Sequence, residues 1–352
     1  MKPNKSIVVD SPGKASIHEV PYPTLPADDY LIVKPRAVAI NPVDWKQIDA
    51  DGDRRTDGCQ VGFDYAGTVE EVGPGVTLPF KKGDRVAGAI HGTNTHLKSN
   101  GGFATYATAR EFLQAHIPES LSFEEAATQG VALATIGLTY RFLQLPWPTE
   151  PAREPFDIFI YGGSTAMGIT MIQMASLSGG TVIATSSPSN AEYMKSLGAS
   201  HVLDYKSDSL TEDILKLTGS QLKYAVDCHS DEFSATLCAK VLQGSEARMA
   251  SLRRTEDIVK ATNPNLEHEE IKGYLAFGGV WNSAGDFEAR PQDYDYMKTF
   301  GPMFWGLLGA GKLKPPRLYV NHGGSGLDGV LAGLDKLRNG QVSAGKLVYS
   351  ME

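Results

Sequence analysis

The segment FDIFIYGGSTAMGITMIQMASLSGG, residues 156–180, decides the fold prediction. Its apolar start predicts a buried strand, Gly162 and Gly163 predict a tight turn, and a helix follows from about Ser164. Two kinds of site use a strand, a turn and a helix in this order. In a dinucleotide site, glycines let the backbone approach the pyrophosphate, and the helix N-terminus supplies N–H donors. In a nucleophile elbow, which has the pattern G-x-S-x-G, Ser164 would be the nucleophile.

The chain after this segment alternates strand and helix patterns. Apolar runs predict further strands at residues 180–185, 200–205, 224–228 and 247–251, and helix-compatible stretches lie between most of them. This alternation predicts a parallel sheet that is covered by helices on both faces. We therefore expect an α/β, doubly wound domain over residues 126–289.

The rest of the chain has a β-rich pattern, in which short Val- and Ile-rich runs are separated by Gly, Pro and Asp. The predicted strands lie at residues 6–10, 30–40, 64–73, 84–90 and 345–350. Ser122 and Glu125 form a capping box that predicts a helix start, and the proline-rich residues 145–156 predict a loop. We expect one discontinuous domain, made of residues 1–125 and 290–352, into which the doubly wound domain is inserted.

Composition excludes several functional classes. The 352 residues carry a net charge of -8, which argues against general nucleic-acid binding, because such binding needs a basic surface. The three cysteines have no metal-ligand spacing, and reduced cysteines are typical of a cytoplasmic protein. The N-terminus lacks a secretory signal pattern, and no apolar run is long enough to span a bilayer.

The residues after the second predicted strand bear on the choice of cofactor. About 20 residues after the glycine turn, dinucleotide-binding folds place the side chain that contacts the adenosine ribose. Residues 185–190 are TSSPSN and include no acid, while Lys195, Tyr205 and Lys206 follow nearby. Hydroxyl and amide groups can bind a 2′-phosphate, whereas a carboxylate would repel it. This turn therefore favours NADPH over NADH. Ordinary capping and turn roles for these residues are the alternative.

The elbow interpretation needs a serine, an acid and a histidine in that chain order. Ser164, Asp295 and His322 satisfy the order, but no HGGG-type oxyanion motif precedes the serine. A serine hydrolase therefore stays as a distant alternative.

Several motifs together resemble the medium-chain dehydrogenase/reductase superfamily along nearly the whole chain. They are AVAINPVDWK (37–46), GFDYAGTVEEVGPGV (62–76), KKGDRVAG (81–88), GGFATYA (101–107), SLSFEEAA (120–127) and the glycine turn. The zinc alcohol dehydrogenases of this superfamily have a His-Glu pair after the glycine that is Gly62 here, and a four-cysteine lobe. This chain has Phe63 and Asp64 and no such lobe, so the resemblance is to the zinc-free branch, with no metal.

The segments YGGSTAMGITMIQMASLSG, ATSSPSNAEYMKSLGASHVLDY, LKYAVDC and GQVSAGKLV resemble enoyl reductases that act in trans with fungal polyketide synthases, of the lovastatin enoyl reductase type. The resemblance implies a GroES-like catalytic domain and a Rossmann domain. It also implies NADPH-dependent reduction of an α,β-unsaturated acyl thioester on an acyl carrier domain, in a monomeric enzyme. A zinc-free quinone or enone oxidoreductase that acts on small free substrates is the alternative. The glycines within residues 275–285 would interrupt an interface strand that dimeric relatives use.

The resemblance also implies residue roles. The cofactor-binding residues would be Pro42, Val43, Asp44 and Trp45 at the nicotinamide, Gly162, Gly163, Ser164, Thr165, Ala166 and Met167 at the pyrophosphate, Ser187, Pro188, Ser189, Asn190 and Tyr205 at the 2′-phosphate, and Ser251, Leu252, Val342 and Ser343 closing over the cofactor. The acyl channel would be lined by Ala132, Leu133, Ala134, Thr135, Ile136, Gly137, Leu138 and Thr139, and by Leu275, Ala276, Phe277, Gly278 and Gly279. Val43 and Trp45 stand where smaller polar residues are expected.

Lys46 and Thr135 are the candidate catalytic residues. Negative charge builds on the thioester oxygen during reduction, and a lysine or a hydroxyl aimed at that oxygen would stabilise it. The alternative to a catalytic role is that Lys46 is an ordinary surface lysine and that Thr135 only packs within a helix. The proton donor is not assigned: water, Tyr65 and His91 are considered. The basic residues Lys312, Lys314 and Arg317 are the candidate docking site for an acidic carrier domain.

Overall fold

The computed structural model of the chain describes residues 2–279, 281, 282, 286, 287 and 290–352. Its contacts divide the chain into two units. Unit 1 consists of Met1–Ala134 and Gly273–Glu352, and unit 2 is Thr135–Lys272. The first division falls later in the chain than the expected boundary at residues 125 and 126, and the second falls earlier than the expected boundary at residues 289 and 290.

Unit 2 is built on one parallel sheet. Its strands are β8 (Phe156–Tyr161), β9 (Gly180–Ser186), β10 (His201–Asp204), β11 (Tyr224–Asp227), β12 (Arg248–Ser251) and β13 (Glu267–Glu270). The order across the sheet is β10-β9-β8-β11-β12-β13, and every pairing is parallel. This order confirms the Rossmann prediction, and it places the topological switch between β8 and β11.

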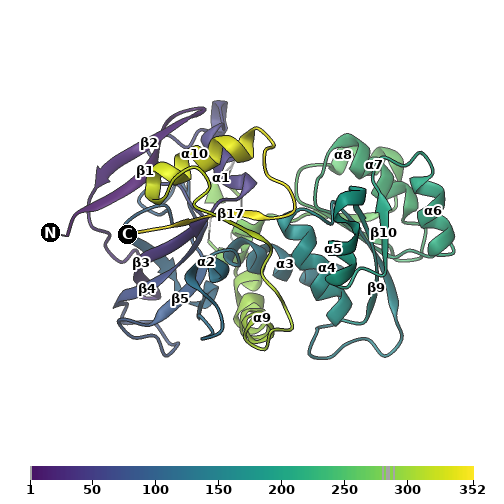
Figure 1. Cartoon of the computed structure of the whole chain (residues 1–352), viewed down its shortest axis with the longest axis horizontal. Coiled ribbons are helices and arrows are strands. Elements are labelled where there is room, and N and C mark those ends of the chain that lie inside the picture. Colours follow the sequence, from purple (N-terminus) through teal and green to yellow (C-terminus); the bar gives the residue numbers. More distant parts are fainter. Residues whose placement is uncertain (1, 280, 283–285, 288–289) are drawn as a thin grey trace. The chain divides into compact units, whose positions relative to one another are not determined.

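Helices cover this sheet, as strand–helix alternation predicts (Figure 1). They are α4 (Ala166–Leu177), η3 (Pro188–Asn190), α5 (Ala191–Ser196), α6 (Leu210–Leu217), α7 (Glu232–Val241) and α8 (Glu256–Thr262). Phe159, Ile183, Ala225 and Met249 lie in the apolar core of the unit, each at most 1% exposed. The strand β13 was not predicted, because its sequence EHEE has no apolar residue. Charged side chains are common on strands at a sheet end.

Unit 1 contains a mostly antiparallel sheet in the order β16-β17-β3-β4-β5-β7, with β6 paired to β3. The strands of this sheet are β3 (Tyr30–Ala39), β4 (Asp64–Val72), β5 (Arg85–Ala89), β6 (Ala107–Arg110), β7 (Gln114–His116), β16 (Leu318–Val320) and β17 (Lys346–Ser350). Two separate two-stranded sheets pair β1 (Asn4–Ser11) with β2 (Lys14–Val20) and β14 (Trp281–Asn282) with β15 (Asp286–Phe287). In the seven-stranded sheet, the core is apolar. Leu31, Val33, Val38, Val86 and Val348 are fully buried in this sheet. This β-rich unit confirms the predicted fold class.

The helices of unit 1 connect these strands. They are α1 (Pro42–Ile48), η1 (Gly52–Arg54), η2 (Glu111–Leu113), α2 (Phe123–Ala126), η4 (Gly273–Phe277), α9 (Pro291–Gly309) and α10 (Gly326–Arg338), and α3 (Gly130–Leu143) starts in unit 1. The capping box is confirmed, because the Ser122 hydroxyl accepts from the Glu125 N–H and the Glu125 carboxylate accepts from the Ser122 N–H. Within the glycine-containing segment 275–285, residues 280 and 283–285 lie outside the described residues, so the interface interpretation stays a prediction.

Candidate cofactor site and candidate catalytic segments

The glycine turn follows β8 and carries the features of a phosphate-binding turn. Gly162 has a φ of 77°, which L side chains rarely adopt. A Cβ on Gly168 would lie 2.3 Å from the Gly162 carbonyl oxygen and 2.7 Å from the Gly163 Cα, so α4 packs closely on the turn. The first N–H groups of a helix have no intrahelical partner. Those of Ala166 and Met167, at the start of α4, are therefore suited to hold a pyrophosphate.

Thr165 holds the turn together rather than facing outward with its hydroxyl. Its Oγ1 donates to the Gly162 carbonyl at 2.8 Å and accepts from the Gly168 N–H at 3.0 Å. The helix consequently begins at Ala166, with Thr165 as N-cap. The Thr185 hydroxyl accepts from the Gly162 N–H at 2.9 Å and fixes the turn to β9. The Ser164 side chain is partly exposed, so it is the hydroxyl of this turn that a pyrophosphate can reach.

Asp227, at the end of β11, organises the other side of the topological switch. Its carboxylate is fully buried and accepts from the N–H groups of His229 and Ser230 and from the Ser234 hydroxyl at 2.7–3.0 Å. This loop places Cys228 beside Gly162, because a Cβ on Gly162 would lie 3.6 Å from the Cys228 Cβ. Sequence reasoning missed Asp227, although an acid at the end of an apolar strand was a visible signal.

The turn after β9 presents hydroxyl and amide groups and no carboxylate. Ser187 Oγ lies 3.0 Å from Ser189 Oγ and accepts from the Asn190 side chain at 3.1 Å, while Pro188 is exposed. Tyr205, after β10, is 38% exposed, and the Lys206 Nζ lies 5.6 Å from its ring centre.

Tyr205 and Lys206 border an open hollow of about 730 Å³ between α6 and α7. Phe233, which sequence reasoning did not select, lines the same hollow and is 58% exposed. Ser251 and Leu252 follow β12, where the Leu252 N–H donates to Ser230 and the Ser251 hydroxyl donates to the Arg253 carbonyl. The predicted cofactor residues of unit 2 thus lie at or just after the carboxyl ends of β8, β9, β10 and β12, where such sheets bind ligands.

The segment 342–344 of unit 1 carries the remaining pair of expected cofactor residues. Val342 packs against the core of unit 1, while Ser343 is exposed. The Tyr319 hydroxyl donates to the Ser343 carbonyl at 2.8 Å, and Ala344 has a φ of 51°. A side chain of β16 therefore binds this segment, and the segment includes a residue with an uncommon backbone conformation.

The short helix α1 carries Lys46. Pro42 is exposed at its first position, whereas Val43, Trp45 and Lys46 are partly buried. The fully buried Asp44 carboxyl group accepts from the Asn41 N–H at 2.6 Å and so anchors the start of the helix. Burial raises the pKa of Asp44 to about 8, and the nearby Asp64 carboxylate adds to this effect. The Lys46 Nζ lies 5.6 Å from the Trp45 ring centre.

An aromatic cluster surrounds Phe63, the residue at the position of a zinc ligand in the zinc alcohol dehydrogenases. Its ring lies 5.5 Å from Tyr274 and 6.0 Å from His91, and His91 lies 5.1 Å from Phe277. The structure bears on the two proton-donor candidates. Tyr65 is fully buried and its hydroxyl donates to Gln114, while burial lowers the pKa of His91 to about 3, which disfavours a protonated imidazole near neutral pH.

The two segments predicted to line the acyl channel are largely buried. Leu275, Ala276 and Phe277 are buried, Gly278 is partly exposed and Gly279 is exposed. Residues 132–139 are all buried within α3. Successive helical residues point about 100° apart, so these eight residues face in several directions and line more than one surface.

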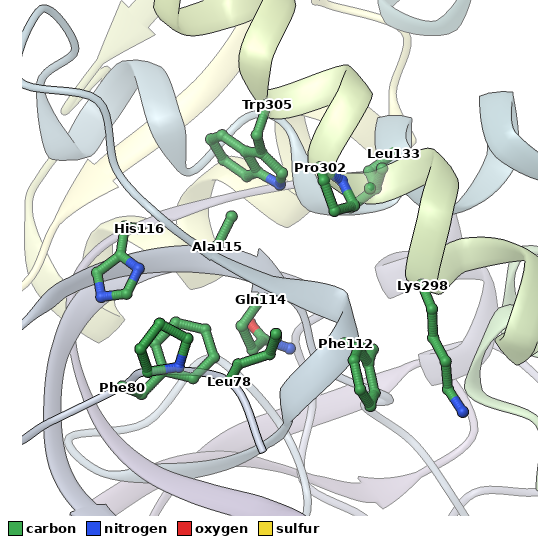
Figure 2. Close-up of a pocket in the computed structure, with 12 residues that line it drawn as sticks. Leu78, Phe80, Phe112, Gln114, Ala115, His116, Leu133, Lys298, Pro302 and Trp305 are labelled. Carbon is green, nitrogen blue, oxygen red and sulfur yellow. The ribbon is translucent and has the colours of Figure 1, made fainter. Parts of the chain in front are cut away.

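Leu133 faces a small apolar cavity of about 180 Å³ in unit 1. Figure 2 shows that Lys298, Pro302 and Trp305, all from α9, lie across the cavity from Phe112 of η2 and from Gln114 and Ala115 of β7. The buried Trp305 Nε1 has no hydrogen-bond partner in the described structure. Thr135 lies two positions after Leu133 and therefore points about 200° away around the helix.

The acid and the histidine of the hydrolase alternative each contact a lysine. Asp295 pairs with Lys298 at 2.7 Å, and the His322 Nδ1 lies 2.7 Å from the Lys336 Nζ. Across the described ranges, no group of three or more His, Cys, Asp or Glu side chains could hold a metal ion. No helix in the described part of the chain is long and apolar enough to cross a membrane.

Comparison with known proteins identifies matching families, similar sequences and a similar structure. Residues 27–119 match the family described as "Alcohol dehydrogenase GroES-like domain", and residues 166–287 match "Zinc-binding dehydrogenase". The chain is 39% identical over 366 residues to trans-enoyl reductase resD of Aspergillus sclerotiorum, covering 98% of this chain and 99% of the relative. It is 44% identical over 300 residues to trans-enoyl reductase TOXD of Cochliobolus carbonum, covering 84% and 98%. The crystal structure of CurK enoyl reductase has the same fold, with a TM-score of 0.79 at 18% identity over the whole of both chains.

Proposed function

Because the chain belongs to the trans-enoyl reductases of the medium-chain dehydrogenase/reductase superfamily, we propose that it reduces an α,β-unsaturated acyl thioester with NADPH. The chain is an oxidoreductase that acts on CH–CH bonds. The acyl group would be carried by the acyl carrier domain of a partner polyketide synthase, in the cytoplasm. The observation that carries the cofactor proposal is the exposed turn Ser187–Asn190, which has hydroxyl and amide groups and no carboxylate one strand after the glycine turn.

The cofactor, when bound, supplies the hydride for the β-carbon. The N–H groups of Ala166 and Met167 and the Ser164 hydroxyl would hold its pyrophosphate, and the Ser187 turn with Tyr205 would hold the 2′-phosphate. Lys46, or Thr135, would stabilise the negative charge that develops on the thioester oxygen. Water is the proposed source of the proton for the α-carbon. We propose that no zinc takes part, since the Phe63 side chain has no ligand atom.

The test is a fluorescence titration with NADPH and NADH, followed by turnover of a crotonyl pantetheine thioester. NADPH should bind at least tenfold more tightly than NADH, and the thioester should be reduced faster than a simple quinone or enone. No NADPH binding at tens of micromolar would defeat the proposal. Preferential quinone reduction would favour the alternative oxidoreductase, and activity on an ester without cofactor would favour the hydrolase.

The basic turn before β16 is the proposed docking surface for the carrier domain. Lys312, Lys314 and Arg317 are exposed and lie beside Tyr319 and Val320, which are 38% and 45% exposed. Replacing the three basic residues by alanine should slow reduction of a carrier-bound enoyl group and leave a free pantetheine thioester unaffected. Equal rates for both substrates would contradict the docking proposal. We also propose a monomer, which sedimentation would check.

A further inference from the structure

Asp64, the residue after Phe63, binds three separate segments of unit 1. The carboxylate is fully buried at the start of β4. Its Oδ2 accepts from the Lys346 Nζ and, at 2.9 Å, from the Asn41 side-chain amide. Its Oδ1 accepts from the Val131 N–H at 2.6 Å. We refer to Asp64, Lys346, Asn41 and the Val131 N–H as the Asp64 cluster.

Two of the segments in the Asp64 cluster are the starts of the helices that carry the candidate catalytic residues. Asn41 is the N-cap of α1, which carries Lys46. Val131 is the second residue of α3, on which Thr135 follows one turn later. We propose that Asp64 is a positioning residue for the reaction proposed above: it fixes the starts of α1 and α3 on β4, and Lys346 holds the carboxylate in place for both. The inference rests on the proposed function for its catalytic meaning.

The packing at the start of α3 supports this role independently. A Cβ on Gly130 would lie 2.2 Å from the Gly88 carbonyl oxygen and 2.7 Å from Asp64 Oδ1. The helix start therefore approaches the carboxylate so closely that a side chain at position 130 has no room. A helix N-terminus also attracts negative charge, which strengthens the bond from Val131 to Asp64.

The energetics favour a geometric role over a stabilising one. Lys346 is 4% exposed, and its Nζ also donates to the Thr128 carbonyl at 3.0 Å. Burying both charges costs desolvation energy that their attraction offsets only in part, so well-packed apolar side chains often stabilise a core equally well. An apolar pair, however, would make no directional bonds to two helix starts. The charged pair therefore contributes mainly by fixing the positions of the two helix starts.

The test separates the two links. Asn41→Ala removes the link to α1 and leaves the ion pair intact, so kcat for the enoyl thioester should fall at least tenfold while KM changes less than threefold. Backbone N–H exchange in residues 43–48 should speed up at least tenfold, with residues 131–135 unchanged. The double variant Asp64→Asn with Lys346→Gln removes both charges together, and exchange should then speed up in both helix starts.

Asn100→Ala is the matched control, because Asn100 is 3% exposed, accepts from the Thr108 hydroxyl at 3.0 Å and is not part of the Asp64 cluster. It should destabilise the chain without lowering kcat or affecting exchange in α1. Unchanged exchange in α1 after Asn41→Ala, or an equal loss of kcat in both alanine variants, would overturn the positioning role. If the wild-type chain reduces no enoyl thioester, the proposed function fails, while the exchange data still decide whether Asp64 fixes the two helices.

Discussion

The glycine turn of unit 2 and the Asp64 cluster of unit 1 hold backbone segments in place by opposite means. The turn does so by leaving side chains out: Gly162 and Gly168 let the chain fold onto itself, and a hydroxyl closes the loop. The cluster does so by burying charge: one carboxylate binds an ammonium, an amide and a helix N-terminus. The turn should therefore be most sensitive to added volume, and the cluster region to a change of charge or protonation. The four predictions below test this contrast.

The largest effect is expected for added volume in the turn. In Gly168→Ala the new methyl group would overlap the backbone of Gly162 and Gly163, which is not a flexible side-chain end. NADPH affinity should fall about 100-fold, about 2.7 kcal/mol. Gly306→Ala in α9 is the matched control, since nothing lies within 4 Å of its Cβ position, and alanine there should be neutral or slightly stabilising. Fluorescence titration of both variants decides, and equal affinities would contradict the packing argument.

A pH effect is expected next, beside the Asp64 cluster. Asp44 has an ordinary pKa of 3.8 when exposed, and burial raises the folded value to about 8. Between these pH values the folded chain keeps a proton that the unfolded chain has released, so stability falls as the pH rises.

Asp44→Asn removes this titration. Urea unfolding at pH 5 and pH 8 should therefore show that the wild type loses more stability than the variant as the pH rises. Asp53→Asn, at an exposed position, should leave the wild-type pH dependence unchanged. Parallel profiles for wild type and Asp44→Asn would show that Asp44 is not buried as a proton-bearing acid.

A change of charge in the turn after β9 should alter the preference between NADPH and NADH. Ser187→Asp places a carboxylate in the turn after β9, where it would repel a 2′-phosphate and accept from a ribose hydroxyl. The ratio of NADPH to NADH affinity should fall at least tenfold, measured by the same titration. Ser200→Asp, an exposed position just before β10, tests whether added negative charge alone has this effect. An unchanged ratio in Ser187→Asp would separate this turn from the 2′-phosphate.

The smallest effect is expected for Ser164→Ala, which removes one hydroxyl and adds no volume. NADPH affinity should fall only a few-fold, in line with about 1 kcal/mol for one hydrogen bond, and turnover at saturating cofactor should persist. Thr165→Val should have a larger effect, because it removes two bonds inside the turn. A complete loss of turnover in Ser164→Ala at saturating NADPH would revive the nucleophile interpretation.

Local sequence patterns predicted the structural elements that depend on neighbouring residues. The apolar run Phe156–Tyr161 is a strand, the Ser122 capping box starts a helix, and the glycine turn lies between a strand and a helix. The strand β13 escaped prediction because its residues are charged, and pairing with β12 rather than apolar burial defines it.

Contacts between distant residues could not be read in the same way. Residues 41, 64, 131 and 346 are far apart in the sequence and meet only in the folded unit, so neither spacing nor composition indicates the Asp64 cluster. Thr165 is predicted to lie at the pyrophosphate, and the sequence does not show that its hydroxyl is bonded to Gly162 and Gly168.

The internal hydrogen bonds of the glycine turn have a consequence for ligand binding. Gly162 is already bound to Thr185, and Thr165 to Gly162 and Gly168, without any ligand contribution. A pyrophosphate that binds at this turn, as proposed above, would require no ordering of the loop, which lowers the entropy lost on binding. Differences in affinity among variants of the turn after β9 should then arise mainly from the dissociation rate of the dinucleotide.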